Sequence, residues 1–225
     1  MYVSPEIVVG FHGCDRSVAD KVIKQGEALA KSENDYDWLG HGIYFWEGSY
    51  QRALEWAKAG KNISQPAVVG AFIKLGNCLD LLDYEHIQTV KTIYTILETE
   101  FQQVGKAVPQ NRVLVNGVSF VRELDCQVIL RLLQLNNEGI AEELGLSDLS
   151  GENKKQIQGH PNFIDSVRGI FPEGNELYPG AGFLNKNHIQ LCIINPNSII
   201  GYFEPRQQSD WYKKLWTISE IAMIC

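Results

Sequence analysis

Apolar residues recur along this chain in two patterns. Short apolar runs bounded by turn residues predict buried strands, and apolar residues spaced three and four apart predict helices that bury one face. We expect strands at 6–11, 42–46, 67–75, 166–171, 188–194 and 198–203. We expect helices at 17–25, 50–59, 84–104 and 119–136, a short helix within 137–162, and helical packing of the tail around Trp211.

Strands and helices follow one another in mixed order, which is typical of an α+β protein with a mostly antiparallel sheet. The chain has 225 residues, which is enough for one domain with a sizeable core and short for two. The sequence contains no internal repeat and no linker-like change in composition. We therefore expect residues 1–225 to form a single domain.

Composition and charge narrow the functional classes. Apolar residues make up 44% of the chain and charged residues 21%, as in ordinary globular proteins. The net charge is −7 without a Lys/Arg cluster, so tight nucleic-acid binding by bulk electrostatics is not expected. The longest apolar runs fall well short of the roughly 18–20 residues that span a bilayer, and residues 1–10 lack the features of a signal peptide. We expect no membrane partner and, by default, a cytoplasmic location.

The cysteines and histidines argue against a metal site and against a disulfide framework. The five cysteines are odd in number and widely spaced without a Cys-x-x-Cys motif, and the five histidines include no His-Glu-x-x-His motif. These spacings do not fit the usual zinc sites or a disulfide-stapled fold. We expect mostly buried thiols and no metal cofactor.

Candidate chemistry gathers at the edges of three predicted strands. The first place is His12-Gly13, the second is Gly42-Ile43-Tyr44 within the aromatic stretch 35–46, and the third is His188-Ile189-Gln190. The aromatic strand has two interpretations. Its rings could fill volume in the core, or they could form a platform on which a flat ligand ring stacks.

Taken in this order, the three motifs resemble those of the ADP-ribosyltransferase family, in its diphtheria toxin and poly(ADP-ribose) polymerase branch. The matching residues are Phe11-His12-Gly13-Cys14, the run Gly-His-Gly-Ile-Tyr-Phe at 40–45, and the strand at 190–196. The resemblance covers roughly 1–80 and 165–204. It implies a split, mostly antiparallel sheet with flanking helices, a helical insertion at about 84–160, and NAD as the substrate.

The resemblance also implies roles for individual residues. His12 would hydrogen-bond a ribose hydroxyl in the adenosine half of NAD, and the backbone of Gly13 would hold the nicotinamide amide, for which a residue without a side chain is needed. Tyr44 would stack on the nicotinamide ring, with Trp56 as the second wall of the slot. The loop 35–40 would form a flap over the ligand.

At the position of the family's catalytic glutamate this chain has Gln190. A neutral amide can accept a hydrogen bond from a ribose hydroxyl, but it cannot balance the positive charge that develops when the bond to nicotinamide breaks. His188, two positions earlier on the same strand face, would contact the acceptor. Either the enzyme transfers a single ADP-ribose unit or hydrolyses NAD with weaker electrostatic help, or another carboxylate supplies the missing charge. The candidates are Glu173, Asp35, Asp37 and Glu47.

Our first hypothesis is a toxin-like, NAD-dependent mono-ADP-ribosyltransferase that cleaves the nicotinamide–ribose bond and modifies a protein or nucleic-acid acceptor. A toxin-like enzyme would also have a cognate inhibitor or antitoxin as a partner. Two alternatives stay open, an NAD glycohydrolase and a catalytically weak module that only binds NAD or ADP-ribose. A relative of the tRNA 2′-phosphotransferases would need a set of basic residues that we do not find in this sequence.

Overall fold

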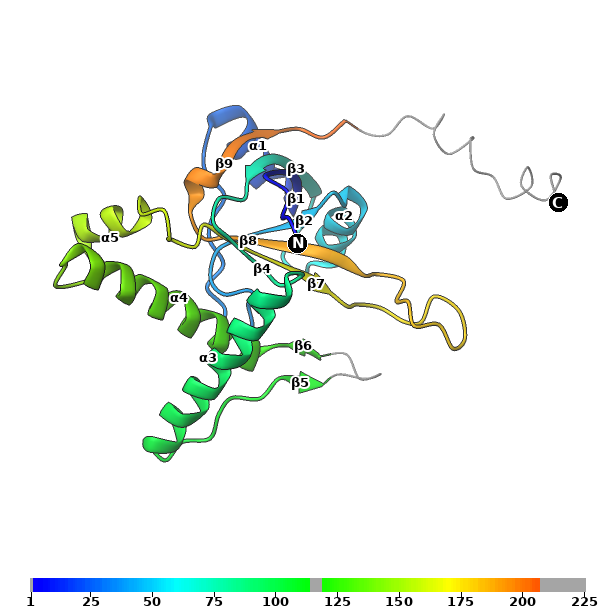
Figure 1. Ribbon diagram of the computed structural model, residues 1–225. Helices are drawn as coiled ribbons and strands as arrows, with labels where there is room; N and C mark the ends of the chain where they lie inside the picture. Colours follow the sequence, from blue (N-terminus) through cyan, green and yellow to red (C-terminus); the bar gives the residue numbers. More distant parts are fainter. Residues whose placement is uncertain (1, 114–118, 207–225) are drawn as a thin grey trace.

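The computed structural model describes residues 2–113 and 119–206, and a seven-stranded sheet forms its centre (Figure 1). The strand order is β4-β7-β8-β2-β1-β3-β9. Neighbouring strands are antiparallel except β4 and β7, which are parallel. The expected α+β class with a mostly antiparallel sheet is confirmed. The strands are β1 (Ile7–Asp15), β2 (Ile43–Glu47), β3 (Pro66–Lys74), β4 (Cys78–Asp80), β7 (Ser166–Phe171), β8 (His188–Ile193) and β9 (Ile199–Phe203).

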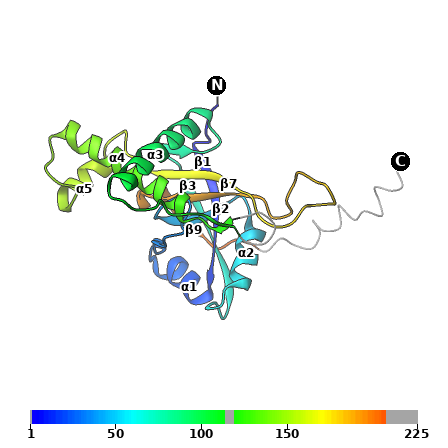
Figure 2. The ribbon, with the colours of Figure 1, turned by 90° about the horizontal axis from the view of Figure 1, so that it is seen from below.

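Helices flank this sheet in two groups. Figure 2 shows α3, α4 and α5 gathered at one end of the molecule, whereas α1 and α2 lie beside β1 and β3. A small two-stranded ribbon of β5 and β6 connects α3 to α4. The bounds are α1 (Arg16–Gln25), α2 (Tyr50–Ala59), α3 (Tyr84–Gln103), β5 (Arg112–Val113), β6 (Ser119–Val121), α4 (Glu123–Leu144) and α5 (Gly151–Gln158).

The alternation of side chains along β2 decides which of them reach the site. Ile43 and Phe45 are fully buried and pack in the core cluster that includes α1. Tyr44 and Trp46 point the other way, Tyr44 against the cluster that includes α3 and α4, and Trp46 against α2. The aromatic stretch therefore fills the core with one face and is available to a cavity with the other.

The helical segment 84–160 contributes directly to the core. Ile93 and Leu97 on α3 and Val128 and Leu132 on α4 face one hydrophobic cluster together with residues of β7 and β8. The apolar stripe expected on α3 is only partly buried, because Leu97 lies in the core whereas Tyr84 and Ile87 at its start are exposed. This segment therefore covers one side of the sheet that carries the candidate motifs.

The predicted start of the first helix was wrong. β1 continues to Asp15, so His12-Gly13 lies inside the strand and not at its end. Asp15 caps α1, because its carboxylate accepts the backbone N–H of Ser17 at 3.0 Å. Ser17, at which the helix was expected to begin, is the second residue of the helix.

The helix predicted at 119–136 was displaced and too short. It begins at Glu123 and continues to Leu144, whereas Ser119 lies in β6. Its first-turn amides are satisfied by the side-chain oxygen of Asn111, which lies outside the helix and accepts two of their hydrogen bonds. A cap supplied from so far away leaves no local pattern in the sequence.

Three short strands, β4, β5 and β6, lay beyond the sequence pattern. The short strand β4 was not predicted, and it pairs with β7 in parallel. The connection 172–187 between β7 and β8 projects from the body of the molecule as a long hairpin-like loop (Figure 1). The predicted packing of the tail around Trp211 lies outside the described residues.

Candidate functional site

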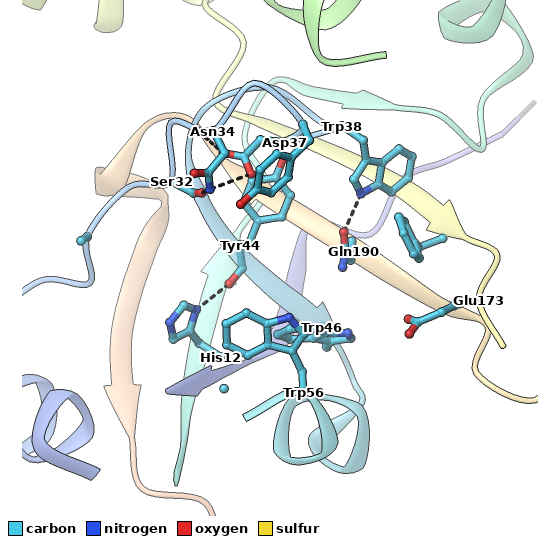
Figure 3. Close-up of a pocket in the computed structure, with 14 residues that line it drawn as sticks. His12, Ser32, Asn34, Asp37, Trp38, Tyr44, Trp46, Trp56, Glu173 and Gln190 are labelled. Atoms are coloured by element: carbon cyan, nitrogen blue, oxygen red, sulfur yellow. Dashed lines mark hydrogen bonds between the residues drawn. The ribbon is translucent and has the colours of Figure 1, made fainter. Parts of the chain in front are cut away.

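One cavity of about 370 Å³ collects most of the predicted site residues. It opens beside β8, β2 and β1, which are neighbours in the sheet, and is closed by α2, the loop before β2 and the end of β7 (Figure 3). Its volume is in the range of small-molecule sites. The lining residues are His12, Gly13, Ala30, Ser32, Asn34, Tyr36, Asp37, Trp38, Tyr44, Trp46, Trp56, Phe171, Glu173 and Gln190.

The cavity forms where β1 and β2 separate. The last pair of their ladder in this direction is Phe11–Trp46, although β1 stays paired with β3 as far as Asp15. At the next position, Nδ1 of His12 lies 2.8 Å from the carbonyl oxygen of Tyr44. The imidazole thus takes the place of a backbone partner at the point where the sheet splits.

This hydrogen bond fixes the tautomer of His12. A carbonyl oxygen only accepts, so Nδ1 carries the hydrogen and donates to Tyr44, and Nε2 keeps a lone pair. Burial lowers the pKa of His12, and the hydrogen bond to Tyr44 opposes this shift only in part. At neutral pH the side chain is therefore an uncharged imidazole whose Nε2 can accept a hydrogen bond from a hydroxyl.

The ring of Tyr44 is held by the loop that precedes it. The Tyr44 hydroxyl donates to Gly40 O at 2.8 Å and accepts the backbone N–H of Leu39 at 3.1 Å. Burial raises the pKa of Tyr44, so the phenol stays protonated and keeps its role as donor. Asp37 closes the loop, because its carboxylate accepts the backbone N–H of Asn34 at 2.8 Å. The segment expected to act as a flap is therefore bonded to one wall of the cavity.

Gln190 is oriented by Trp38. The indole N–H of Trp38 donates to Gln190 Oε1 at 2.5 Å. Because an indole only donates, its partner must be the amide oxygen, and the NH₂ group of Gln190 is on the side away from the indole (Figure 3). The sequence analysis expected Gln190 to accept from a ribose hydroxyl. In the structure its oxygen is engaged by Trp38, and the group it offers to the cavity is a donor.

Trp38 was not among the predicted site residues. Its indole lies over β7 at Gly169, where a Cβ atom would come within 2.8 Å of the ring carbon Cη2. Gly169 is also the ladder partner of Gln190. The aromatic stretch drew attention to this part of the chain, but the pairing of Trp38 with a residue 152 positions later could not be inferred from it.

Two tryptophans form the side of the cavity next to α2. The ring centroids of Trp46 and Trp56 are 5.7 Å apart and the ring planes are inclined by 48°. Trp46 is buried, whereas Trp56 is 48% exposed. Figure 3 shows Trp56 and His12 on the side of the cavity opposite the loop that carries Asn34. The two predicted ring walls, Tyr44 and Trp56, thus line the same cavity.

His188 does not reach the cavity. Its side chain is 2% exposed, and its ring packs against Trp46 at 6.1 Å and Phe171 at 5.3 Å between centroids. Nδ1 donates to the carbonyl of Lys186, and burial lowers the pKa of His188. The residue lies behind the aromatic side of the cavity and not at the surface where an acceptor would arrive, so its expected acceptor contact is not supported.

The four candidate carboxylates have different positions. Glu173 and Asp37 line the cavity, and Asp35 and Glu47 do not. Glu47 is paired with the buried Arg168 at 2.6 Å on another part of the sheet, and Asp37 is used in the loop as described above. Glu173 lies 2.7 Å from Arg52 of α2, and its side chain is 20% exposed. It is therefore the candidate carboxylate that faces the cavity without serving the loop.

Gly13 lines the cavity, but the structure gives its small size another cause. A Cβ atom at Gly13 would lie 2.2 Å from the carbonyl oxygen of Ala53 in α2. Glycine is therefore required here for α2 to pack on β1. This packing places α2, and with it Trp56, beside the cavity.

Other kinds of site find little support in the part of the chain that the structure describes. Residues 2–113 and 119–206 contain no group of three His, Cys, Asp or Glu side chains placed to hold a metal ion. None of the described helices has the length and apolarity needed to cross a membrane. The thiols of Cys14, Cys78 and Cys126 are buried, and burial raises the pKa of each to about 11, which disfavours reactivity.

Comparison with known proteins adds one relative. No family model and no solved structure matches the chain. Among curated proteins, the chain is similar to an uncharacterized protein of Methanocaldococcus jannaschii, with 23% identity over 234 residues, 95% of this chain and 91% of that protein. The similarity therefore extends over the motif-bearing ends and most of the helical segment between them.

Proposed function

We propose that this protein binds NAD in the cavity and transfers its ADP-ribose unit to a macromolecular acceptor. The observation that carries the proposal is the convergence of His12, Tyr44 and Gln190, one from each of three neighbouring strands, on one cavity of about 370 Å³. These are the positions at which the sequence motifs resemble those of ADP-ribosyltransferases.

The cavity offers suitable groups for the two ends of a nicotinamide riboside. Tyr44 and Trp56 provide ring faces for the nicotinamide, and an offset contact of this kind is worth about 0.5–1.5 kcal/mol beyond its buried area. Nε2 of the neutral His12 is suited to accept a hydrogen bond from a ribose hydroxyl. In this proposal the loop around Asn34 covers the ligand from the opposite side.

The reaction breaks the bond between the nicotinamide nitrogen and the ribose carbon C1′. The electron pair leaves with nicotinamide, positive charge develops on the ribose, and an oxygen or nitrogen of the acceptor forms the new bond to C1′ and loses its proton. We assign the stabilisation of the positive charge to Glu173, whose carboxylate faces the cavity and is held by Arg52 at 2.7 Å. Gln190 would then hold a ligand oxygen through its NH₂ group. Building of a chain of ADP-ribose units is disfavoured because Gln190, and not a carboxylate, occupies the position of the family's glutamate.

A second candidate function is a module that binds NAD or ADP-ribose without cleaving it. The contact that favours it is the hydrogen bond from Trp38 to Gln190 Oε1, because it turns N–H donors and not an anion toward the bound ribose. If Glu173 does not serve the reaction, the cavity keeps its binding groups and lacks a charge opposite the ribose.

Incubation with doubly labelled NAD separates these functions. Release of nicotinamide with label on a macromolecule from cell extract supports transfer, and release without such label supports hydrolysis. Binding of NAD without release supports the module. The absence of both binding and release would refute the proposal.

Two variants then test the assignment of the carboxylate. Glu173→Gln should lower nicotinamide release by at least about 100-fold, because a charge aimed at the reacting centre is worth several kcal/mol. Its matched control is Glu176→Gln in the same connection, an exposed residue outside the cavity, which should leave the rate unchanged. Gln190→Glu should raise the rate or leave it unchanged. Equal rates for the two glutamate variants would remove Glu173 from the mechanism.

A further inference from the structure

A second cavity lies on the other side of Trp38. It has a volume of about 350 Å³ and is built by α3, the first turns of α4 and the residue after β4. We call it the rear cavity and the NAD candidate site the front cavity. Trp38 lines both. The apolar wall of the rear cavity consists of Trp38, Leu81, Val90, Tyr94, Leu124, Val128 and Ile129.

The charged groups of the rear cavity are mostly positive. Lys91, Arg122 and Asp125 line it, which gives two cations and one carboxylate. Asp125 accepts a hydrogen bond from Asn111 at 2.8 Å, and its carboxylate lies 3.8 Å from the guanidinium of Arg122. The cavity therefore combines an apolar interior with a net positive charge.

Arg122 is placed to meet a ligand within an apolar setting. Its guanidinium carbon lies 4.8 Å from the ring centroid of Trp38 and 4.4 Å from that of Phe171, and its side chain is 13% exposed. Burial lowers the pKa of Arg122, which indicates a desolvated guanidinium. The N-terminus of α4 is not the source of the positive field, since Asn111 accepts its first amides.

We propose that the rear cavity binds an organic monoanion with an aromatic or aliphatic body, and that Trp38 transmits its presence to the front cavity. The body of the ligand packs between α3 and α4, and its carboxylate, sulfonate or phosphate group pairs with Arg122 and Lys91 at the rim. Trp38 connects the two sites because the indole that forms the rear wall also orients Gln190 through its N–H.

The effect on the front cavity has a defined mechanical basis. The indole rests on β7 at Gly169 and donates to Gln190 across a single hydrogen bond of 2.5 Å. In this proposal, a ligand that contacts the rear face of the ring alters the hydrogen bond from Trp38 to Gln190 and leaves the pairing of the strands intact. Only the consequence for NAD rests on the proposed function, because binding of the anion and movement of the indole do not require NAD.

Titration with anilinonaphthalene sulfonate tests the site, because this aromatic monoanion becomes fluorescent in an apolar environment. Its uncharged analogue phenylnaphthylamine serves as the second probe. We expect saturable binding of the sulfonate to the folded full-length chain at one site. Val90→Trp, which fills the cavity, should weaken this binding at least about tenfold. Thr89→Trp is the matched control, because the neighbouring residue on α3 lines a different cavity, and it should bind as the wild type does.

Charge and coupling need separate readouts. Arg122→Gln should weaken binding of the sulfonate at least about fivefold and leave the uncharged probe unaffected. The indole N–H resonance of Trp38, assigned with Trp38→Phe, should shift when the sulfonate binds. Any one of three results would overturn the proposal. The first is equal affinity of Val90→Trp and Thr89→Trp for the sulfonate, and the second is an equal loss of affinity for both probes in Arg122→Gln. The third is a Trp38 resonance that does not shift when the sulfonate is saturating. Thermal melts of each variant check that it is folded. None of these outcomes depends on nicotinamide release, so this proposal and the proposed function can fail separately.

Discussion

The two cavities on either side of Trp38 are built in different ways. The front cavity is lined from β1, β2 and β8 and from a hydrogen-bonded loop, and the polar atoms of His12 and Gln190 have fixed partners there. The rear cavity is lined mainly by side chains of α3 and α4, and most of its wall is apolar. In the front cavity the sheet holds polar groups in fixed positions. The rear cavity mainly provides volume for an apolar ligand body, with positive charge for its anionic group.

The difference follows from what fixes each wall. In the sheet, the ladder pairs Phe11–Trp46 and Trp46–Gln190 set the relative positions of three strands, so each side chain on them has a defined neighbour. Between helices no such register exists, and packing of side chains sets the spacing. Trp38 belongs to both environments, because its N–H serves the polar site and its ring serves the apolar one. Substitutions of Trp38, or of Gly169 beneath its ring, should therefore affect ligand binding in the two cavities unequally.

The largest effect is expected from Trp38→Ala, which removes the wall between the cavities. Loss of this buried ring should reduce the free energy of unfolding by about 3–5 kcal/mol. It should also weaken the binding of both NAD and the sulfonate probe, as measured by calorimetric titration of protein that remains folded. Trp56→Ala is the comparison for the sulfonate only, since Trp56 is 48% exposed and lines only the front cavity of the two, so it should weaken NAD binding and leave binding of the sulfonate unchanged. A Trp38→Ala variant that binds both ligands normally would contradict the shared-wall description.

A smaller effect is expected from Gly169→Ala, which acts on Trp38 from below. The added methyl group would lie 2.8 Å from the indole, so the ring must move, at a cost of about 1–3 kcal/mol in unfolding free energy. Gly201→Ala on β9 is the matched control, because a Cβ atom there meets no atom within 4 Å. Denaturant unfolding of both variants measures the difference. Equal stability of the two would show that Trp38 is not confined by β7.

Acid should reduce the stabilising contribution of His12 in the front cavity and the affinity of this cavity for NAD. Burial lowers the pKa of His12, so the unfolded chain binds a proton at higher pH than the folded chain does. The contribution of the neutral imidazole to stability is therefore complete above the unfolded pKa of about 6.5 and is lost as the pH falls through the lower pKa of the folded state. His12→Asn should flatten this part of the pH dependence of unfolding. NAD affinity of the wild type should fall as the pH passes through the lowered pKa of the folded state, because protonated Nε2 can no longer accept a hydrogen bond.

The smallest effect is expected from Trp38→Phe, which keeps a ring in the wall and removes the N–H. Loss of one hydrogen bond should cost about 0.5–1.5 kcal/mol of unfolding free energy. The rear cavity should bind the sulfonate almost as before, whereas nicotinamide release should change because Gln190 is no longer oriented. Titration of the sulfonate and an assay of nicotinamide release, run on the same preparation, show which cavity responds. A loss confined to the rear cavity would reverse the roles assigned to the N–H and the ring.

Much of the fold could be predicted because the strands and helices that build it carry strong local periodicity. The apolar run at 67–75 became β3, and the stripe from Tyr84 onward became α3, within a residue or two of the expected bounds. Prediction failed where the determinant was distant in sequence. Asn111 caps α4 from outside the helix, and β4 depends on pairing with β7.

The site followed the same division. The motifs that contain His12, Tyr44 and Gln190 pointed to three strands, and the structure brings all three residues to one cavity. The orientation of the Gln190 amide could not be inferred, since it depends on a tertiary contact with Trp38. The burial of His188 was missed for a related reason. Strand alternation gives the face on which a residue lies, but not whether neighbouring aromatic rings cover it.

Calorimetric titration of NAD into the wild type, Tyr44→Ala and Tyr84→Ala tests the central claim most directly. Tyr44 is the wall of the front cavity, whereas Tyr84 is an exposed residue at the start of α3 and lines neither cavity. We predict saturable binding to the wild type and to Tyr84→Ala, and at least about tenfold weaker binding to a folded Tyr44→Ala variant, because the ring contact and the loop that it anchors are both lost. Failure of the wild type to bind NAD, or equal affinity of all three proteins, would contradict the assignment of this cavity to NAD.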